Sequence, residues 1–193
     1  MVINLIKYVA FFLNMIIFIS CNHEGIYDRG KAKKMIDEAY SELRLKDDSL
    51  TYSSALNKIE KAIGYDSSYA GAFISKANLL CRLNLCDSSA RFLDYYYYKF
   101  INDTWYNITS GIVMLKIDKN SVAREYFIKA IRIIGDPKNS NESITFIQLK
   151  YFLYGKEVAF KELDRLKAKM TDMDYNLTKD MVENTSQYEM FDF

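Results

Sequence analysis

A pattern of small and large apolar residues recurs along this chain at a fixed spacing, and that recurrence limits the folds open to it. The pattern is Ala, three residues, a large apolar residue, two residues and Ala; it is formed by Ala55, Ile59 and Ala62. Adding 68 to each of these numbers gives Ala123, Phe127 and Ala130, and a degenerate copy lies midway at Ser89, Leu93 and Tyr96, so the period is 34. Small residues recur in the preceding segments too, since Gly111 follows Ala77 by one such period. Paired helices approach to about 8–10 Å, which favours small side chains at their crossing.

Over residues 31–170 this pattern resembles the tetratricopeptide (TPR) family, whose unit spans about 34 residues. The resemblance implies an all-α fold: a right-handed α-solenoid of about four TPR-like helical hairpins, followed by a capping helix in residues 171–193. The second helix of the fourth unit has shifted, because Ala159, Leu163 and Leu166 lie two residues beyond the strict period. The alternative is an ordinary helical bundle with accidental periodicity.

The scarcity of helix breakers agrees with an all-helical domain, since the chain has 1 Pro and 7 Gly. Apolar spacing and capping residues predict helices near 31–46, 51–64, 68–84, 88–101, 104–117, 120–134, 141–154 and 156–169. We expect Gly64 and Gly135 to end the two best-matching helices. A ninth helix is predicted over 174–190, with Leu177, Met181, Tyr188 and Phe191 on one apolar stripe.

Residues 1–20 have the features of a processing signal. A single cation, Lys7, precedes an apolar run of signal-peptide length from Tyr8 to Ile19. The end of this run, with Ser20 before Cys21, resembles the lipobox of bacterial lipoproteins, although Phe18 stands where the family usually has Leu. The resemblance implies acylation of Cys21, a tether over residues 21–30 and localisation in the cell envelope. We expect the outer membrane, with the domain facing the periplasm; an uncleaved anchor and a secretory signal with an incidental cysteine are the alternatives.

Neither composition nor motifs indicate an enzyme. The only His, His23, lies in the predicted tether, where no scaffold supports a general base. The sequence has no Gly-rich phosphate loop and no His-Glu metal motif, so we expect no cofactor and no metal. The formal net charge of +1 argues against a nucleic-acid binder.

Two local features leave alternatives open. Cys81 and Cys86 flank the predicted turn of the second hairpin, and they either form a disulfide there or remain two small buried thiols. The run of four tyrosines from Tyr95 to Tyr98 points in four directions on a helix. We expect Tyr96 to pack in the core, and Tyr95 and Tyr98 to be partly exposed, either in an interface or with their hydroxyls in water.

The resemblance also implies a concave groove lined by the first helix of each hairpin. Counting by the period, the predicted partner-binding residues are Ile74, Asn78 and Arg82, then Trp105, Ile108, Ile112 and Lys116, then Phe146 and Lys150. Arg82, Lys116 and Lys150 are each one period apart and would form a basic column beside an apolar strip. Such a surface suits a peptide segment with apolar anchors and carboxylates; the alternative is that these cations are solvated helix ends.

The sequence therefore predicts a membrane-anchored scaffold that binds another envelope protein or peptide segment through this groove. The alternative function is an accessory ligand-capture or structural subunit of a surface uptake or adhesion complex.

Overall fold

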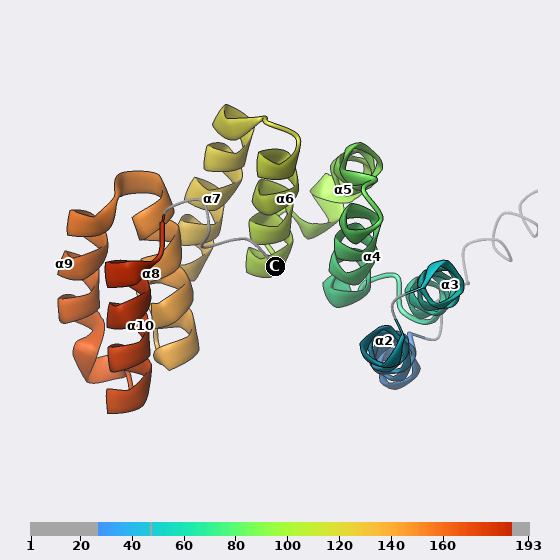
Figure 1. The fold of residues 1–193 in the computed structure, drawn as a ribbon, viewed down its shortest axis with the longest axis horizontal. Helices are drawn as coiled ribbons and strands as arrows, with labels where there is room; N and C mark the ends of the chain where they lie inside the picture. Colours follow the sequence, from blue (N-terminus) through green and yellow to red (C-terminus); the bar gives the residue numbers. More distant parts are fainter. Residues whose placement is uncertain (1–26, 47, 187–193) are drawn as a thin grey trace, which may run out of the picture.

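The structure, a computed structural model, describes residues 27–46 and 48–186, and within these ranges it contains helices and no strand (Figure 1). The helices are α2 (Arg29–Leu45), α3 (Ser49–Tyr65), α4 (Ala70–Arg82), α5 (Cys86–Phe100), α6 (Thr104–Lys116), α7 (Asn120–Ile134), α8 (Ser140–Tyr154), α9 (Lys156–Leu166), a 3-10 turn η1 (Lys167–Lys169) and α10 (Asp172–Asn184).

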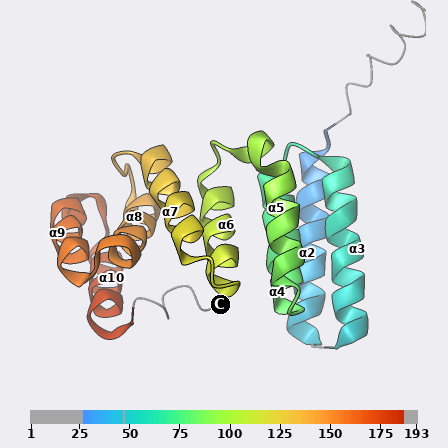
Figure 2. The ribbon, with the colours of Figure 1, turned by 90° about the horizontal axis from the view of Figure 1, so that it is seen from above.

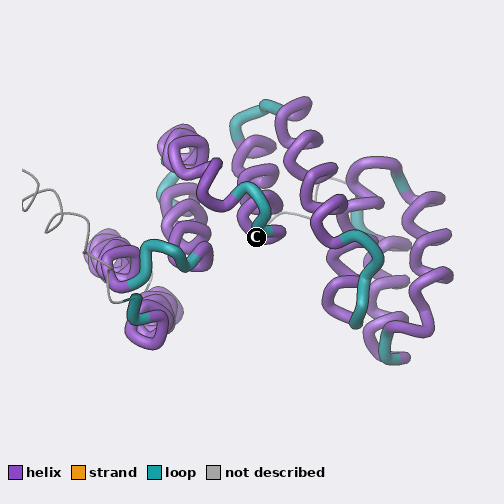
Figure 3. The backbone as a smooth tube through the Cα atoms, turned by 180° about the vertical axis from the view of Figure 1, so that it is seen from behind, coloured by secondary structure: helices purple, strands orange, loops and turns teal. Residues whose placement is uncertain are grey.

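Consecutive helices pack in pairs as four hairpins, α2 with α3, α4 with α5, α6 with α7, and α8 with α9. The hairpins follow one another in a row, and α10 covers the last one by packing on α8 and α9 (Figures 1 and 2). The chain is thus an all-α helical-repeat solenoid with a C-terminal capping helix, as predicted. Figure 3 shows that short loops make each connection between the helices.

The recurring small residues lie where the helices cross. Ala55, Ala62, Ala123 and Ala130 are all inaccessible to solvent, as is Phe127 between the last two. Gly111 of α6 faces Phe127 so closely that a Cβ atom at this glycine would lie 2.4 Å from Cε1 of the ring. The repeat therefore encodes the packing of each hairpin.

The predicted ends of the hairpin helices agree with the structure within about two residues, except that α9 ends at Leu166 and only the 3-10 turn reaches Lys169. The helix predicted over 174–190 instead spans Asp172–Asn184, so its predicted end is wrong. Gly135 ends α7 with a φ of 63°, the left-handed conformation that favours glycine. The prediction for Gly64 is wrong: α3 continues through it and ends at Tyr65, with Asp66 as the C-cap. The domain also begins earlier than residue 31, since Asp28 caps α2 by accepting a hydrogen bond from the Lys31 amide at 2.9 Å.

The predicted apolar face of the C-terminal helix is correct for one of its two described members. Met181 packs against the core, whereas Leu177 is 58% exposed. Thr171 caps α10, and Thr178 and Val182 are its buried residues. Thr178 tolerates burial because its hydroxyl donates to the Asp174 carbonyl at 2.7 Å.

Several sequence predictions lie outside the described residues: the signal segment 1–20, Cys21, most of the tether, Tyr188 and Phe191. None of the described helices has the length and apolar character needed to cross a bilayer.

Candidate peptide-binding groove

The register of the hairpins determines which side chains share a surface. The first helices α4, α6 and α8 begin at residues 70, 104 and 140, which are steps of 34 and then 36. The second helices α5, α7 and α9 begin at 86, 120 and 156, with the same two steps. The loop of residues 135–139 therefore lengthens the period by two, and the shift predicted for α9 already applies to α8.

A groove of about 1130 Å³ runs along the first helices, from α2 across α4 and α6 to α8. Seven of the nine predicted groove residues line it: Ile74, Asn78 and Arg82 on α4, and Trp105, Ile108, Ile112 and Lys116 on α6. The structure thus brings together the predicted residues of the second and third hairpins.

Phe146 and Lys150 do not line the groove. A two-residue shift turns a helical position through about 200°, so counting by 34 selected the wrong face of α8. Lys150 Nζ instead lies 5.2 Å from the ring centres of Phe146 and Tyr154. The groove positions of α8 are Thr145, Gln148 and Leu149, and each follows a groove residue of α6 by the longer step. The same step from Lys116 leads to the buried Phe152, so the basic column ends at Lys116.

Aromatic residues line the edge of the groove at which α4 and α6 begin. Trp105, the only Trp of the chain, is 58% exposed there. Gly71 lies one period before Trp105, and the Tyr69 ring covers it so closely that a Cβ atom would meet Cζ at 2.6 Å. Tyr69 and Trp105 therefore form an aromatic rim, one side chain for each of two repeats.

Several residues of the groove wall were missing from the sequence prediction, among them Tyr40, Tyr69 and Arg29. Tyr40 lies one period before Ile74, so the period already pointed to it. Tyr69 lies within the predicted helix 68–84 and is the N-cap of α4, a position that the resemblance did not assign to the groove. Arg29 was assigned to the tether, yet its guanidinium lies 5.2 Å from the Tyr69 ring centre and its Nε donates to Asp66 at 2.8 Å.

That ion pair fixes the wall of the groove at α2. Burial by itself raises the pKa of Asp66, but hydrogen bonds from Ser68 and Arg29 outweigh it and hold the pKa of this carboxyl below its usual value. Asp66 is therefore ionised at neutral pH and holds Arg29 beside Tyr69.

Polar groups in the floor of the groove remain available for a ligand. Ser75 and Thr109 are one period apart and each 6% exposed, and among the described residues neither hydroxyl has a hydrogen-bond partner. The side chain of the exposed Asn78 is likewise unpaired within this part of the chain. Thr145 differs, since its hydroxyl donates to the Asn141 carbonyl at 2.9 Å. Neither hydroxyl oxygen is closed off from solvent, so the backbone groups of a ligand in the groove could hydrogen-bond to both.

Positive charge collects at the opposite edge, where α4 and α6 end. Arg82 and Lys116 are exposed, and neither forms an ion pair with the described residues. The Arg82 guanidinium lies 5.9 Å from the Tyr52 ring centre. Trp105 and Lys116 lie near opposite ends of the same helix, three turns or about 16 Å apart. The groove is thus aromatic along one edge and cationic along the other.

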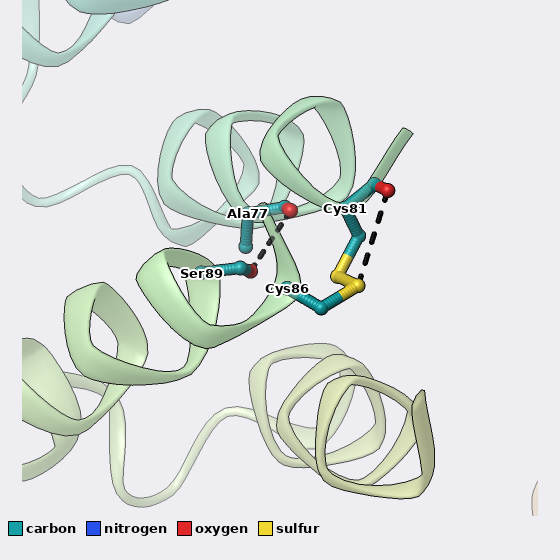
Figure 4. Close-up of a disulfide and its surroundings, with 4 residues drawn as sticks. All are labelled: Ala77, Cys81, Cys86 and Ser89. Atoms are coloured by element: carbon teal, nitrogen blue, oxygen red, sulfur yellow. Dashed lines mark hydrogen bonds between the residues drawn. A yellow bond between two sulfur atoms is a disulfide. The ribbon is translucent and has the colours of Figure 1, made fainter. Parts of the chain in front are cut away.

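A disulfide joins Cys81 and Cys86 across the turn between α4 and α5, which settles the alternative left open by the sequence (Figure 4). Cys81 lines the groove beside Arg82. In the same hairpin the Ser89 hydroxyl donates to the Ala77 carbonyl at 2.9 Å, which explains how the degenerate repeat buries a serine (Figure 4). These two contacts fix the end of α4 that carries Arg82.

The tyrosine run lies outside the groove wall. Tyr95 and Tyr98 are 79% and 85% exposed, whereas Tyr96 packs edge-on against Phe73 at 4.7 Å between ring centres. The predicted division between core and surface is confirmed. Within the described ranges there is no group of three or more His, Cys, Asp or Glu side chains arranged to hold a metal ion.

No family model matches this chain, and no curated protein matches its sequence. The fold and the groove define the class of protein, an all-α helical-repeat solenoid.

Proposed function

We propose that this protein is a membrane-anchored scaffold of TPR type that binds another envelope protein, or a peptide segment of one, in its groove. The observation that carries the proposal is that the groove holds two kinds of group without a partner in the described part of the chain. These are the polar side chains of Ser75, Asn78 and Thr109, and the two cations at the ends of α4 and α6. An extended peptide offers backbone groups to the former and carboxylates to the latter.

The dimensions of the groove support a peptide rather than a metabolite. Its volume of about 1130 Å³ is spread along a groove that runs from α2 across α4 and α6 to α8, a shape that suits an extended segment. Trp105 provides a large exposed aromatic surface, and aromatic residues often dominate binding energy at protein interfaces.

The anchor belongs to the same proposal. Acylation of Cys21 would leave residues 22–27 between the lipid and the cap of α2 at Asp28. We propose that this linkage holds the groove close to a membrane of the envelope, at the periplasmic face of the outer membrane. Replacing Cys21 by Ser should release the protein from membranes, as measured by fractionation and by the mass of the mature N-terminus.

Affinity capture from cross-linked envelopes tests the binding function. The bait variants are Arg82→Glu with Lys116→Glu, and as a matched control Lys150→Glu, which makes the same kind of charge change outside the groove. We expect wild type and control to capture the same envelope protein and the double variant to lose most of it. Equal capture by all three baits, or capture of none, would refute binding at the cationic edge.

A further inference from the structure

We infer that the Cys81–Cys86 disulfide is a thiol–disulfide exchange site, at which a bound segment carrying a cysteine thiol becomes linked covalently and reversibly to Cys81. The inference rests on the proposed function in one respect, that the groove binds peptide segments. Both cysteines belong to the described fold, and Figure 4 shows their sulfur atoms between the last turn of α4 and the first turn of α5.

Only one of these two cysteines lines the groove. Cys81 follows Asn78 by about one helical turn and directly precedes Arg82, and all three residues belong to the groove wall. Cys86 is not part of that wall. In thiol–disulfide exchange the incoming sulfur must reach one sulfur of the disulfide, so access decides which of the two is attacked. A thiol held in the groove therefore meets Cys81.

The two helix ends favour the same direction of attack. Cys86 is the first residue of α5, where the aligned peptide dipoles stabilise a thiolate, and the N-cap residue Leu85 makes no side-chain hydrogen bond to this turn. Cys81 lies in the last turn of α4, where the dipoles disfavour negative charge. Asp87 shares the first turn of α5, but it is exposed, so water and salt screen its charge. Cys86 is therefore the better leaving group.

The exchange balances without a further reagent. The thiolate of the bound segment attacks Cys81 Sγ, a new S–S bond forms there, and the Cys81–Cys86 bond breaks. The electron pair of the broken bond leaves with Cys86 Sγ, which takes up a proton from solvent. When the Cys86 thiolate attacks Cys81 in turn, the original disulfide forms again and the segment leaves as a free thiol. The segment is thus held by a bond that the protein itself can reopen.

The turn that carries the disulfide keeps its shape without a cross-link, as the third hairpin shows. Asn84 and Asp118 are one period apart, and each has a φ of 59°. The amide after each of them donates to the carbonyl five residues before that amide, at 2.9 Å in both hairpins. In the third hairpin, Leu115 and Asn120 stand at the positions of the two cysteines. Opening the disulfide should therefore lower stability but leave the groove in place.

The charge beside the disulfide favours an acidic partner. Arg82 is the neighbour of Cys81, it is exposed, and it forms no ion pair with the described residues. A carboxylate close to the incoming thiol would pair with this guanidinium and raise the local concentration of thiol at the disulfide. The partner that fits the site is thus a segment whose cysteine lies close to a carboxylate.

Exchange of the full oxidised chain with glutathione, a tripeptide thiol that carries carboxylates, tests the chemistry. Samples taken early are quenched with N-ethylmaleimide and digested with trypsin, which separates the cysteines onto peptides 77–82 and 83–91 because it cleaves after Lys76, Arg82 and Arg91. We expect glutathione on Cys81 and maleimide on Cys86, several-fold more often than the reverse. In urea the helix ends are lost, so this preference should disappear.

Two matched variants isolate the role of charge. Measured by intact mass, Arg82→Gln should slow the exchange with glutathione several-fold but should not slow the exchange with cysteamine, a thiol without a carboxylate. Lys150→Gln, which removes a cation outside the groove, should leave both rates unchanged. Equal rates of glutathione exchange for Arg82→Gln and wild type would overturn the acidic preference. Glutathione mainly on Cys86, equal labelling of both cysteines in the folded chain, or exchange only in urea would overturn the exchange site.

The outcome is separable from that of the proposed function. If glutathione does not reach Cys81 but envelope capture depends on Arg82 and Lys116, only this inference fails. If glutathione exchanges selectively at Cys81 but no bait captures an envelope protein, the exchange site stands and the proposed function fails.

Where capture succeeds, a trapping variant tests the covalent step. Cys86→Ser lacks the thiol that reopens the bond, and treatment with Ellman's reagent activates its Cys81 as a mixed disulfide. This bait should hold the captured protein through denaturing washes until a reductant is added, whereas Cys81→Ser treated in the same way should not. Capture without any such covalent retention would overturn the inference.

Discussion

The close contact between Gly111 and Phe127 gives the sharpest test of how the hairpins pack. In the third hairpin, an alanine Cβ at position 111 would lie 2.4, 2.7 and 2.8 Å from three atoms of the Phe127 ring. This ring is inaccessible to solvent, and it packs edge-on against Phe152 at 5.0 Å between ring centres. It has little room to move, so Gly111→Ala should destabilise the protein.

The expected magnitude combines two opposing effects. Overpacking a well-filled core costs about 1–3 kcal/mol, and the severity of this clash favours the upper half of that range. Replacing glycine by alanine inside a helix recovers about 1 kcal/mol. The net loss should be about 1–2 kcal/mol, which lowers the thermal midpoint by roughly 2–8 °C for a domain of this size.

Two further variants isolate the cause. A Cβ atom added at Gly64 of α3 would have no neighbouring atom within 4 Å, so Gly64→Ala should leave the midpoint unchanged or raise it. The second hairpin already has alanine and leucine at the equivalent positions, Ala77 and Leu93. Adding Phe127→Leu to Gly111→Ala should therefore recover stability relative to the sum of the two single changes.

Thermal and urea unfolding followed by far-ultraviolet circular dichroism would measure the single and double variants. A Gly111→Ala protein as stable as wild type would refute the tight crossing of α6 and α7. If the effects of the two single changes simply add in the double variant, contact with the Phe127 ring is not the cause of the destabilisation.

Three other perturbations have defined outcomes. Hydrogen bonds hold the pKa of Asp66 below its usual value, so the contribution of Asp66 to stability should be complete above about pH 4 and decline as the pH falls through the folded-state pKa. The difference in thermal midpoint between wild type and Asp66→Asn should therefore shrink on acidification. A difference that grows on acidification would contradict the assigned ion pair. Reducing the Cys81–Cys86 disulfide, which closes a short loop, should lower the free energy of unfolding by about 2 kcal/mol. Unfolding curves with and without reductant would measure this loss, and identical curves would contradict the role of the disulfide in fixing the turn. Replacing Thr109 by Val should leave stability unchanged or raise it, because the hydroxyl has no partner in the described fold. The same replacement should weaken envelope capture, and unchanged capture would exclude this hydroxyl from binding.

The fold was predictable because its determinants are local and repeated. Buried alanines at the helix crossings recur with the period, and capping residues such as Asp48 and Thr171 place helix starts within about two residues of the prediction. The exceptions arise where a local signal had a competing meaning. Gly64 resembled a helix stop, yet α3 continues through it to Tyr65 and has Asp66 as its C-cap. The stripe through Leu177 and Met181 looked apolar, but only Met181 packs against the core, and the buried residues of α10 are Thr178 and Val182.

The candidate groove was predictable only as far as the period holds. Position-by-position counting located Ile74, Ile108 and their neighbours because α4 and α6 begin one period apart. Arg29 was missed because it lay in the predicted tether, and Tyr69 because the resemblance assigned no groove residue to a helix N-cap. Asp103, one period after Tyr69, also lines the groove, but it is not aromatic, so no residue type repeats at this position.

The two-residue insertion in the loop before α8 explains why fold and site differ in how far sequence predicts them. In the core of the fourth hairpin, the sequence itself shows the two-residue shift. Ala159, Leu163 and Leu166 are buried, and their apolar pattern marks the new register. A groove position has no comparable marker, because a solvent-exposed lysine is compatible with either face of a helix. Counting by 34 therefore assigned Lys150 to the groove, although a displacement of two residues, about 200° around α8, turns it away. With Phe152 buried at the position equivalent to Lys116, the cationic edge has two charges rather than three. Under the proposed function, a bound segment would therefore need two carboxylates about one repeat apart.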